Sequence, residues 1–118
     1  MNLFFEIALF LTPGVGNINY KLLINTFKSA EEVFKQSNNS LRQIKGIGQK
    51  LASNIASKTS YTVAKETIEF AHSHNSQIYY YLNNDYPQRL LKSQDSPVLL
   101  FGKGNMNLNH SKAISIVG

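Results

Sequence analysis

The chain has 118 residues and a mass of 13.3 kDa, the size of one domain or of a small domain with the start of another. Hydrophobic residues make up 42% and charged residues 16%, which is typical of a globular fold and argues against disorder. The formal charge of +5 favours polyanionic partners, although a mildly basic solvated surface explains it equally well. Because the chain has no cysteine, disulfides and thiolate zinc sites are excluded, which fits a reducing cytoplasm.

The first predicted element is an apolar helix over residues 3–11, with Asn2 as its cap. It is apolar around most of its circumference, so we expect it to be central. The run is too short to span a bilayer, and it has neither a basic start nor a cleavage site. We therefore expect a buried helix, without a signal peptide and without a membrane partner.

A proline–glycine break follows, and its pattern is repeated later in the chain. Gly14-Val15-Gly16 has the spacing of a second, degenerate copy of a glycine turn described below. Tyr20 stands where that turn has a small alanine, and Pro13 has no amide to offer. We expect this copy to be structural rather than functional.

Several short helices are predicted in the first 74 residues. Asn17 is expected to cap a helix that reaches Phe27, and the pattern from Ser29 to Glu32 fits a capping box. A polar loop over residues 37–40 is expected to end in a capping Ser40, and another helix runs over residues 61–72. Its predicted inward residues are Val63, Ala64, Ile68 and Phe70 or Ala71. Residues 1–74 are thus predicted to form a compact helical bundle.

The strongest pattern lies between Leu41 and Ile55. It predicts two helices joined by a tight turn at Gly46-Ile47-Gly48, in which the glycines allow positive φ and Ile47 is a buried plug. The second helix starts near Gln49, where its free amides and its dipole attract an anion. This pattern resembles the helix-hairpin-helix of DNA-repair and recombination proteins. The predicted phosphate-binding residues are Lys45, Gly46, Ile47, Gly48, Gln49 and Lys50. A purely structural turn is the alternative.

The character of the chain changes near Asn75. Strands are predicted over residues 77–82, 97–102 and 113–118, with a turn at Asp85-Tyr86-Pro87 and a helical turn over residues 88–92. The last run is apolar and β-branched, as in a strand of a parallel sheet, and we expect it to show apolar faces and unpaired edges. Residues 75–118 are therefore predicted to be the opening strands of an α/β sheet.

Four stretches of the chain carry a family resemblance: the helical part with its glycine hairpin, the stretch from Asp85 to Leu90, and the runs over residues 97–104 and 113–118. In this order they resemble the DprA (Smf) family of bacterial DNA-processing proteins. The resemblance implies an amino-terminal fragment of α+β class, with a SAM-like or helix-hairpin-helix domain (1–74) and the opening strands of a truncated Rossmann-like domain (75–118). It further implies binding of single-stranded DNA and delivery of that DNA to the RecA recombinase in natural transformation, in the cytoplasm.

No constellation of residues predicts catalysis, so we expect no enzyme activity, no metal and no cofactor. Glu66 and Glu69 are explained by a solvated helix face, and His72 and His74 by a helix end. Tyr79 to Tyr81 are expected to pack on alternate faces of a strand rather than to stack nucleobases. Two functions remain: a weak DNA-binding module, or a protein-interaction module that includes a possible homodimer and does not bind DNA.

Overall fold

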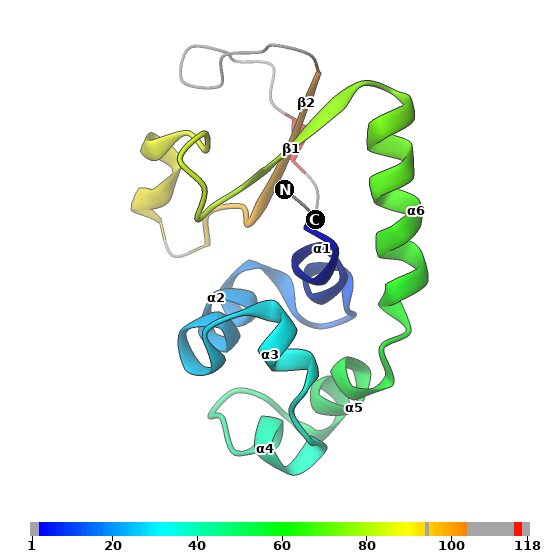
Figure 1. Ribbon diagram of the computed structural model, residues 1–118. Coiled ribbons are helices and arrows are strands. Elements are labelled where there is room, and N and C mark those ends of the chain that lie inside the picture. Colours follow the sequence, from blue (N-terminus) through cyan, green and yellow to red (C-terminus); the bar gives the residue numbers. More distant parts are fainter. Residues whose placement is uncertain (1–2, 94, 104–114, 117–118) are drawn as a thin grey trace.

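The computed structural model describes residues 3–93, 95–103 and 115–116. Helices occupy the first part of the chain and a small antiparallel sheet follows, so the predicted α+β class is confirmed (Figure 1). The helices are α1 (Phe4–Leu11), α2 (Gly16–Phe27), α3 (Ala30–Phe34), α4 (Asn38–Arg42), α5 (Gln49–Ser57) and α6 (Ser60–Ser73). The strands are β1 (Ser76–Tyr80), β2 (Leu99–Lys103) and β3 (Ser115–Ile116), with a 3-10 helix η1 (Gln88–Lys92) between β1 and β2. Among the described residues, every helix is too short or too polar to span a bilayer.

The central helix α1 is positioned by its apolar residues and by two hydroxyl groups. Ile7, Ala8 and Leu9 are fully buried, as the apolar pattern predicts. At its carboxyl end, Thr12 Oγ1 and Ser60 Oγ both donate to the Ala8 carbonyl oxygen, at 2.8 and 2.7 Å. These bonds fix the start of α6 against α1, and from there α6 runs toward the sheet (Figure 1).

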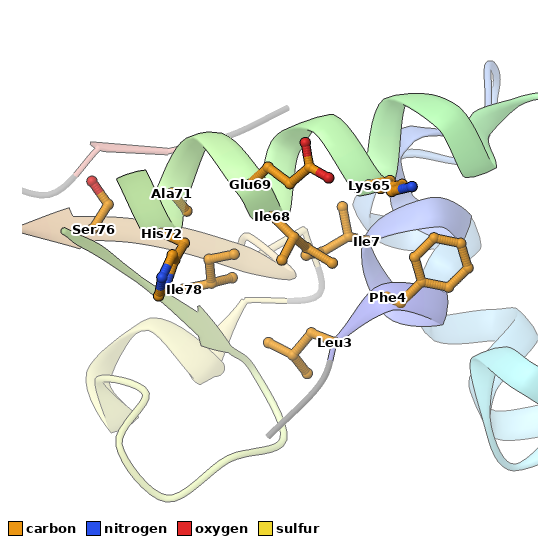
Figure 2. A pocket seen from close by; sticks show the side chains of 10 residues that line it. All are labelled: Leu3, Phe4, Ile7, Lys65, Ile68, Glu69, Ala71, His72, Ser76 and Ile78. Carbon is orange, nitrogen blue, oxygen red and sulfur yellow. The ribbon is translucent and has the colours of Figure 1, made fainter. Parts of the chain in front are cut away.

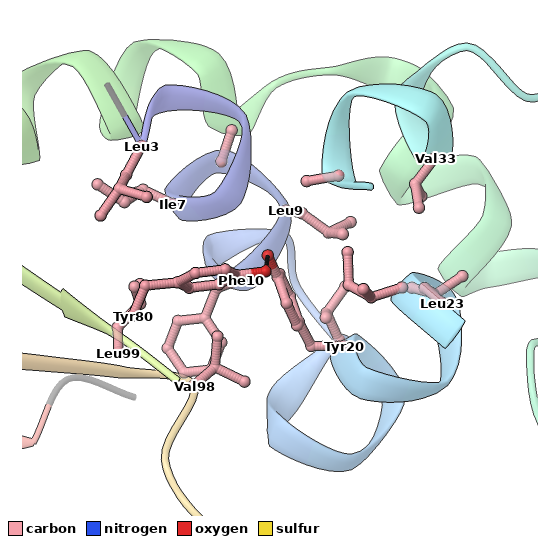
Figure 3. Close-up of a cluster of buried hydrophobic side chains, with 14 of the residues drawn as sticks. Leu3, Ile7, Leu9, Phe10, Tyr20, Leu23, Val33, Tyr80, Val98 and Leu99 are labelled. Atoms are coloured by element: carbon pink, nitrogen blue, oxygen red, sulfur yellow. Dashed lines mark hydrogen bonds between the residues drawn. The ribbon is translucent and has the colours of Figure 1, made fainter. Parts of the chain in front are cut away.

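The core is continuous between the helices and the sheet. Figure 3 shows Phe10 and Tyr20 of the helical part meeting Tyr80, Val98 and Leu99 of the sheet region. The Tyr20 and Tyr80 hydroxyl groups hydrogen-bond to each other at 2.8 Å, although both side chains are buried. The two buried hydroxyl groups therefore satisfy each other's hydrogen bonding inside the core.

Three helix starts differ from the sequence prediction. Asn2 lies outside the described residues, and α1 starts at Phe4 with Leu3 at the cap position and no side-chain cap. Asn17 lies inside α2, and its Oδ1 accepts from the Val98 amide at 3.0 Å, so its carboxamide is used for a tertiary contact. Ser37, not Ser40, caps α4, because its Oγ accepts from the Ser40 amide at 3.2 Å. The Ser29 cap is confirmed, with Oγ accepting from the Glu32 amide at 3.2 Å.

One expectation about side-chain direction was wrong, since Val63 points outward from α6 with 49% of its surface exposed. Ala64 is buried as predicted, and of the alternatives Phe70 and Ala71 it is Ala71 that is buried, while Phe70 is 61% exposed. The small alanines let α6 approach α1 closely, which turns the larger residues away. Tyr79, Tyr80 and Tyr81 are all buried, which agrees with the prediction that they pack rather than form an open stacking surface.

The sheet is antiparallel with the order β1-β2-β3, which corrects the expectation of a parallel sheet. Ile78 pairs with Phe101 between β1 and β2, and Leu100 pairs with Ile116 between β2 and β3. The final run is thus described at Ser115 and Ile116, whose backbone pairs with β2. The rest of the predicted strand, with its expected exposed faces, lies outside the described residues.

Candidate nucleic-acid interface

The two glycine turns have closely similar backbones. Gly14 and Gly46 adopt φ values of +93° and +98°, which only glycine adopts without strain. The following Val15 and Ile47 are 2% and 4% exposed, which confirms the predicted buried plug. Their amides donate to the carbonyl oxygens three residues earlier, those of Thr12 and Ile44, at 3.1 and 3.0 Å. The internal repeat seen in the sequence is therefore a structural repeat.

The third residue of each turn behaves differently. Gly16 has φ +63°, whereas Gly48 has φ −85° and ψ 178°, an extended conformation that any residue can adopt. The expectation of positive φ thus holds for Gly46 and not for Gly48. A Cβ added at Gly48 would meet no heavy atom within 4 Å. Glycine at this position therefore leaves open space in front of α5 rather than fulfilling a backbone requirement.

The amino terminus of α5 is exposed and has no side-chain cap. Gly48 occupies the cap position, and the Ala52 amide donates to the Gly48 carbonyl oxygen at 3.0 Å. The preceding amides of the first turn, those of Gln49, Lys50 and Leu51, have no hydrogen-bond acceptor among the described residues. Gly46, Gly48, Gln49 and Lys50 are all exposed. The amino terminus of α5 can therefore bind an anion without first breaking a hydrogen bond within the protein.

The cations around this turn point to solvent. Lys45 and Lys50 are exposed, as are Arg42 at the end of α4 and Lys58 at the end of α5. Helices α4 and α5 lie at the end of the molecule away from the sheet (Figure 1). This end therefore presents a surface of positive charge, which we call the hairpin end and which comprises residues 42–58.

Sequence reasoning missed one signal for this surface. Between Val33 and Lys65 the chain contains no aspartate or glutamate. Six cations occur in the same interval: Lys35, Arg42, Lys45, Lys50, Lys58 and Lys65. A search for runs of adjacent charges does not find this separation of basic from acidic residues, because the cations are spread along the interval rather than clustered. Lys35 differs from the others in that its ammonium lies 3.5 and 3.4 Å from the Glu31 and Glu32 carboxylates.

The two glycine turns face each other across a shallow groove of about 430 Å³. Asn54 Nδ2 donates to the Pro13 carbonyl oxygen at 3.0 Å, which joins α5 to the first turn. Leu51 lies against Gly14, where an added Cβ would come within 3.3 Å of its Cδ1. The groove is lined by Pro13, Gly14, Gly48, Lys50, Leu51 and Asn54. The first turn thus forms a wall of the hairpin end, so both predicted turns meet at one place.

A larger cavity of about 640 Å³ lies elsewhere, between α1, α6 and β1 (Figure 2). Leu3, Ile7 and Ile68 gather at its apolar floor, and Lys65 and Glu69 project from α6 at its rim (Figure 2). No group of three or more metal-ligating side chains occurs there or elsewhere in the described part of the chain. His74 stacks on Phe70, with ring centroids 3.9 Å apart, and Glu66 and Glu69 are exposed.

One family model matches the second part of the chain. It is the model of DNA recombination-mediator protein A, and it covers residues 77–118, which include η1, β2 and most of β1. The DprA resemblance is thus confirmed for this part of the chain. No curated protein and no solved structure matches the chain. The family match does not extend over the helical part, which contains the hairpin end.

Proposed function

We propose that the hairpin end binds the phosphate backbone of single-stranded DNA weakly and without sequence preference. A phosphate would sit before α5, held by the free amides of Gln49 and Lys50, while Lys45 and the Lys50 side chain supply charge. The proposal rests mainly on one observation, the exposed and uncapped start of α5 among cations in a segment without acidic residues. The match of residues 77–118 to a DNA-recombination family also supports a role in DNA binding.

For the whole protein, we propose that the hairpin end is part of a helix-hairpin-helix or SAM-like domain formed by residues 1–74. Residues 75–118 would open a Rossmann-like domain, and the protein would deliver single-stranded DNA to a RecA-type recombinase in the cytoplasm during natural transformation. This role is non-catalytic and uses no cofactor. It is supported by the mediator function in the family's description.

The test is titration of a fluorescein-labelled oligothymidylate with the 118-residue chain, followed by fluorescence anisotropy at two salt concentrations. The test variant is Lys45→Glu combined with Lys50→Glu. Its matched control, Lys28→Glu combined with Lys92→Glu, changes the net charge equally at exposed lysines outside the hairpin end. We expect the test variant to bind at least about tenfold more weakly. The slope of log K against log salt should also fall by about 1.4, or roughly 0.7 for each lost phosphate contact.

Binding that is equal in the test variant and its control would remove the hairpin end from the function. Failure of the unaltered chain to bind DNA would instead favour the second candidate, a protein-interaction or dimerisation module. That candidate is supported by the exposed side chains of Phe70, Leu82 and Leu91, which a partner could cover.

A further inference from the structure

A separate groove of about 320 Å³ lies between α2 and the segment that connects β1 to β2. Its apolar walls are Leu82, which follows β1, and Leu91 in η1, and its inner surface includes Tyr81. We call it the leucine groove. It lies beside the sheet region, whereas the hairpin end is formed by α4 and α5 (Figure 1).

The walls of the leucine groove are unusually apolar for a surface. Leu82 is 60% exposed and Leu91 is 38% exposed, and both belong to the few large hydrophobic side chains that are exposed in the described residues. Single exposed leucines are ordinary, but two that line one concave site favour a bound apolar group. Covering them would remove apolar surface from water, which stabilises a complex in proportion to the area buried.

The rim of the groove is cationic. Lys92 ends η1 and is exposed, and it makes no ion pair with the described residues. The Lys21 ammonium donates to the Ser96 carbonyl oxygen and Oγ, at 2.9 and 2.6 Å, and so is held at the opposite side. The Asp95 carboxylate accepts a hydrogen bond from Ser93 and interacts electrostatically with Lys21, and Asp85 lies in an adjoining hollow that shares Leu82. Neither carboxylate lines the groove itself, whereas Lys21 and Lys92 both do, and this favours an anionic ligand.

The side chains that line the groove favour a peptide over a nucleic acid as its ligand. A nucleobase binds by stacking on an open aromatic face. Tyr81 has 9% of its surface exposed, and the Lys21 ammonium lies 5.3 Å from its ring centroid. The exposed walls are aliphatic instead, and they suit a leucine or phenylalanine side chain. Carboxylates beside that side chain would lie near the two ammonium groups.

We propose that the leucine groove binds a short acidic peptide of a partner protein, with a bulky apolar side chain between Leu82 and Leu91 and carboxylates near Lys92 and Lys21. The binding is independent of the proposed phosphate site, since no residue is shared. The chain could therefore hold single-stranded DNA and a protein partner at the same time.

The test uses the 118-residue chain and a fluorescein-labelled hexapeptide of four aspartates followed by leucine and phenylalanine. We expect saturable binding in fluorescence anisotropy, weakened about fivefold to tenfold by Lys92→Glu and by Leu91→Ser. A peptide of four aspartates followed by two serines should bind at least about fivefold more weakly, because the groove loses its apolar contact. Circular dichroism of each variant checks that the fold is kept.

Lys45→Glu combined with Lys50→Glu is the reciprocal control. It should leave peptide binding unchanged while reducing DNA binding, and Lys92→Glu should do the opposite. The proposal is overturned if the leucine–phenylalanine peptide does not bind or binds no better than the serine peptide. It is also overturned if oligothymidylate displaces the peptide, which would make this a nucleic-acid groove. A change of oligomeric mass in Leu91→Ser without a change in peptide binding would likewise replace the peptide by a second copy of the chain.

Discussion

The two glycine turns start from nearly the same backbone and lead to helices with different roles. After the first turn, α2 uses Asn17, Tyr20 and Lys21 to contact the sheet region, through Val98, Tyr80 and Ser96. After the second turn, α5 buries Ala52 and Ile55 and leaves its first turn in solvent. The same turn geometry therefore serves docking in one copy and exposure in the other.

The difference comes from the side chains that follow each turn. At the position where α5 has Ala52, α2 has Tyr20, which is fully buried and reaches across to Tyr80. A tyrosine there extends beyond its own helix, while an alanine allows close helix packing and no further reach. A repeated motif can thus keep its shape while one copy becomes part of the core and the other stays accessible to a ligand.

Truncating Tyr20, through which α2 contacts the sheet region, should have the largest effect on stability. In Tyr20→Ala, the free energy of unfolding should fall by about 3–5 kcal/mol, because a fully buried aromatic ring leaves a cavity and Tyr80 loses its hydroxyl partner. Urea denaturation followed by circular dichroism measures this change. Tyr20→Phe, which keeps the ring, should cost only about 1 kcal/mol. A small loss in Tyr20→Ala would contradict a docking role for α2.

High pH should weaken the same contact. Burial raises the pKa of Tyr20 and of Tyr80 well above the ordinary value, and it raises the pKa of Tyr81 to about 12. Since the folded pKa is raised, this stability is fully present below about pH 10 and is lost as pH rises toward the folded value. At pH 11 the loss should be about 1 kcal/mol for each buried tyrosine, measured by urea denaturation against pH 8. Tyr20→Phe should reduce this pH dependence, and an unchanged profile would show that Tyr20 does not contribute.

Alanine substitutions at Gly46 and Gly48 compare a position that requires positive φ with one that does not. Gly46→Ala should lower the free energy of unfolding by about 1–2 kcal/mol, since alanine is strained at φ +98°. Gly48→Ala should change stability by less than about 0.5 kcal/mol, because its backbone is extended and its surroundings are open. Thermal denaturation of both variants gives the comparison. Equal losses in the two variants would mean that the two glycines of the second turn have the same role.

The contact between the two turns should have the smallest effect. Asn54→Ala removes the hydrogen bond from Nδ2 to the Pro13 carbonyl oxygen at an exposed site and should cost about 0.5–1 kcal/mol. Asn54→Asp is a useful companion, because it also places a negative charge at the hairpin end and should reduce DNA binding as well. If Asn54→Asp bound oligothymidylate as tightly as the unaltered chain, phosphate would not approach this groove.

Much of the second turn could be predicted from the sequence. The glycine spacing, the buried Ile47 and the helix from Gln49 all follow from local preferences within a few residues, and the structure confirms them. The Ser29 cap and α1 were predicted for the same reason. The proposed phosphate-binding role of residues 45–50 remains a prediction, which the DNA titration addresses.

The errors share another cause. Asn17 has the sequence features of a helix cap and bonds to Val98 instead, and Val63 fits an inward position on α6 and points to solvent. In both cases a partner distant in the sequence changes the outcome, since the Val98 amide and the surface of α1 cannot be read from neighbouring residues. The antiparallel sheet was missed because an apolar run has the same composition in either strand direction.

The amino-acid sequence alone indicated the helices, the two glycine turns, the first two strand regions and the likeness of residues 77–118 to the recombination-mediator family, since these depend on local preferences and on ordered motifs. Tertiary structure decided which glycine turn docks and which stays exposed. It also brought Leu82 and Leu91 together beside Lys21, because a groove forms only where distant segments pack against one another.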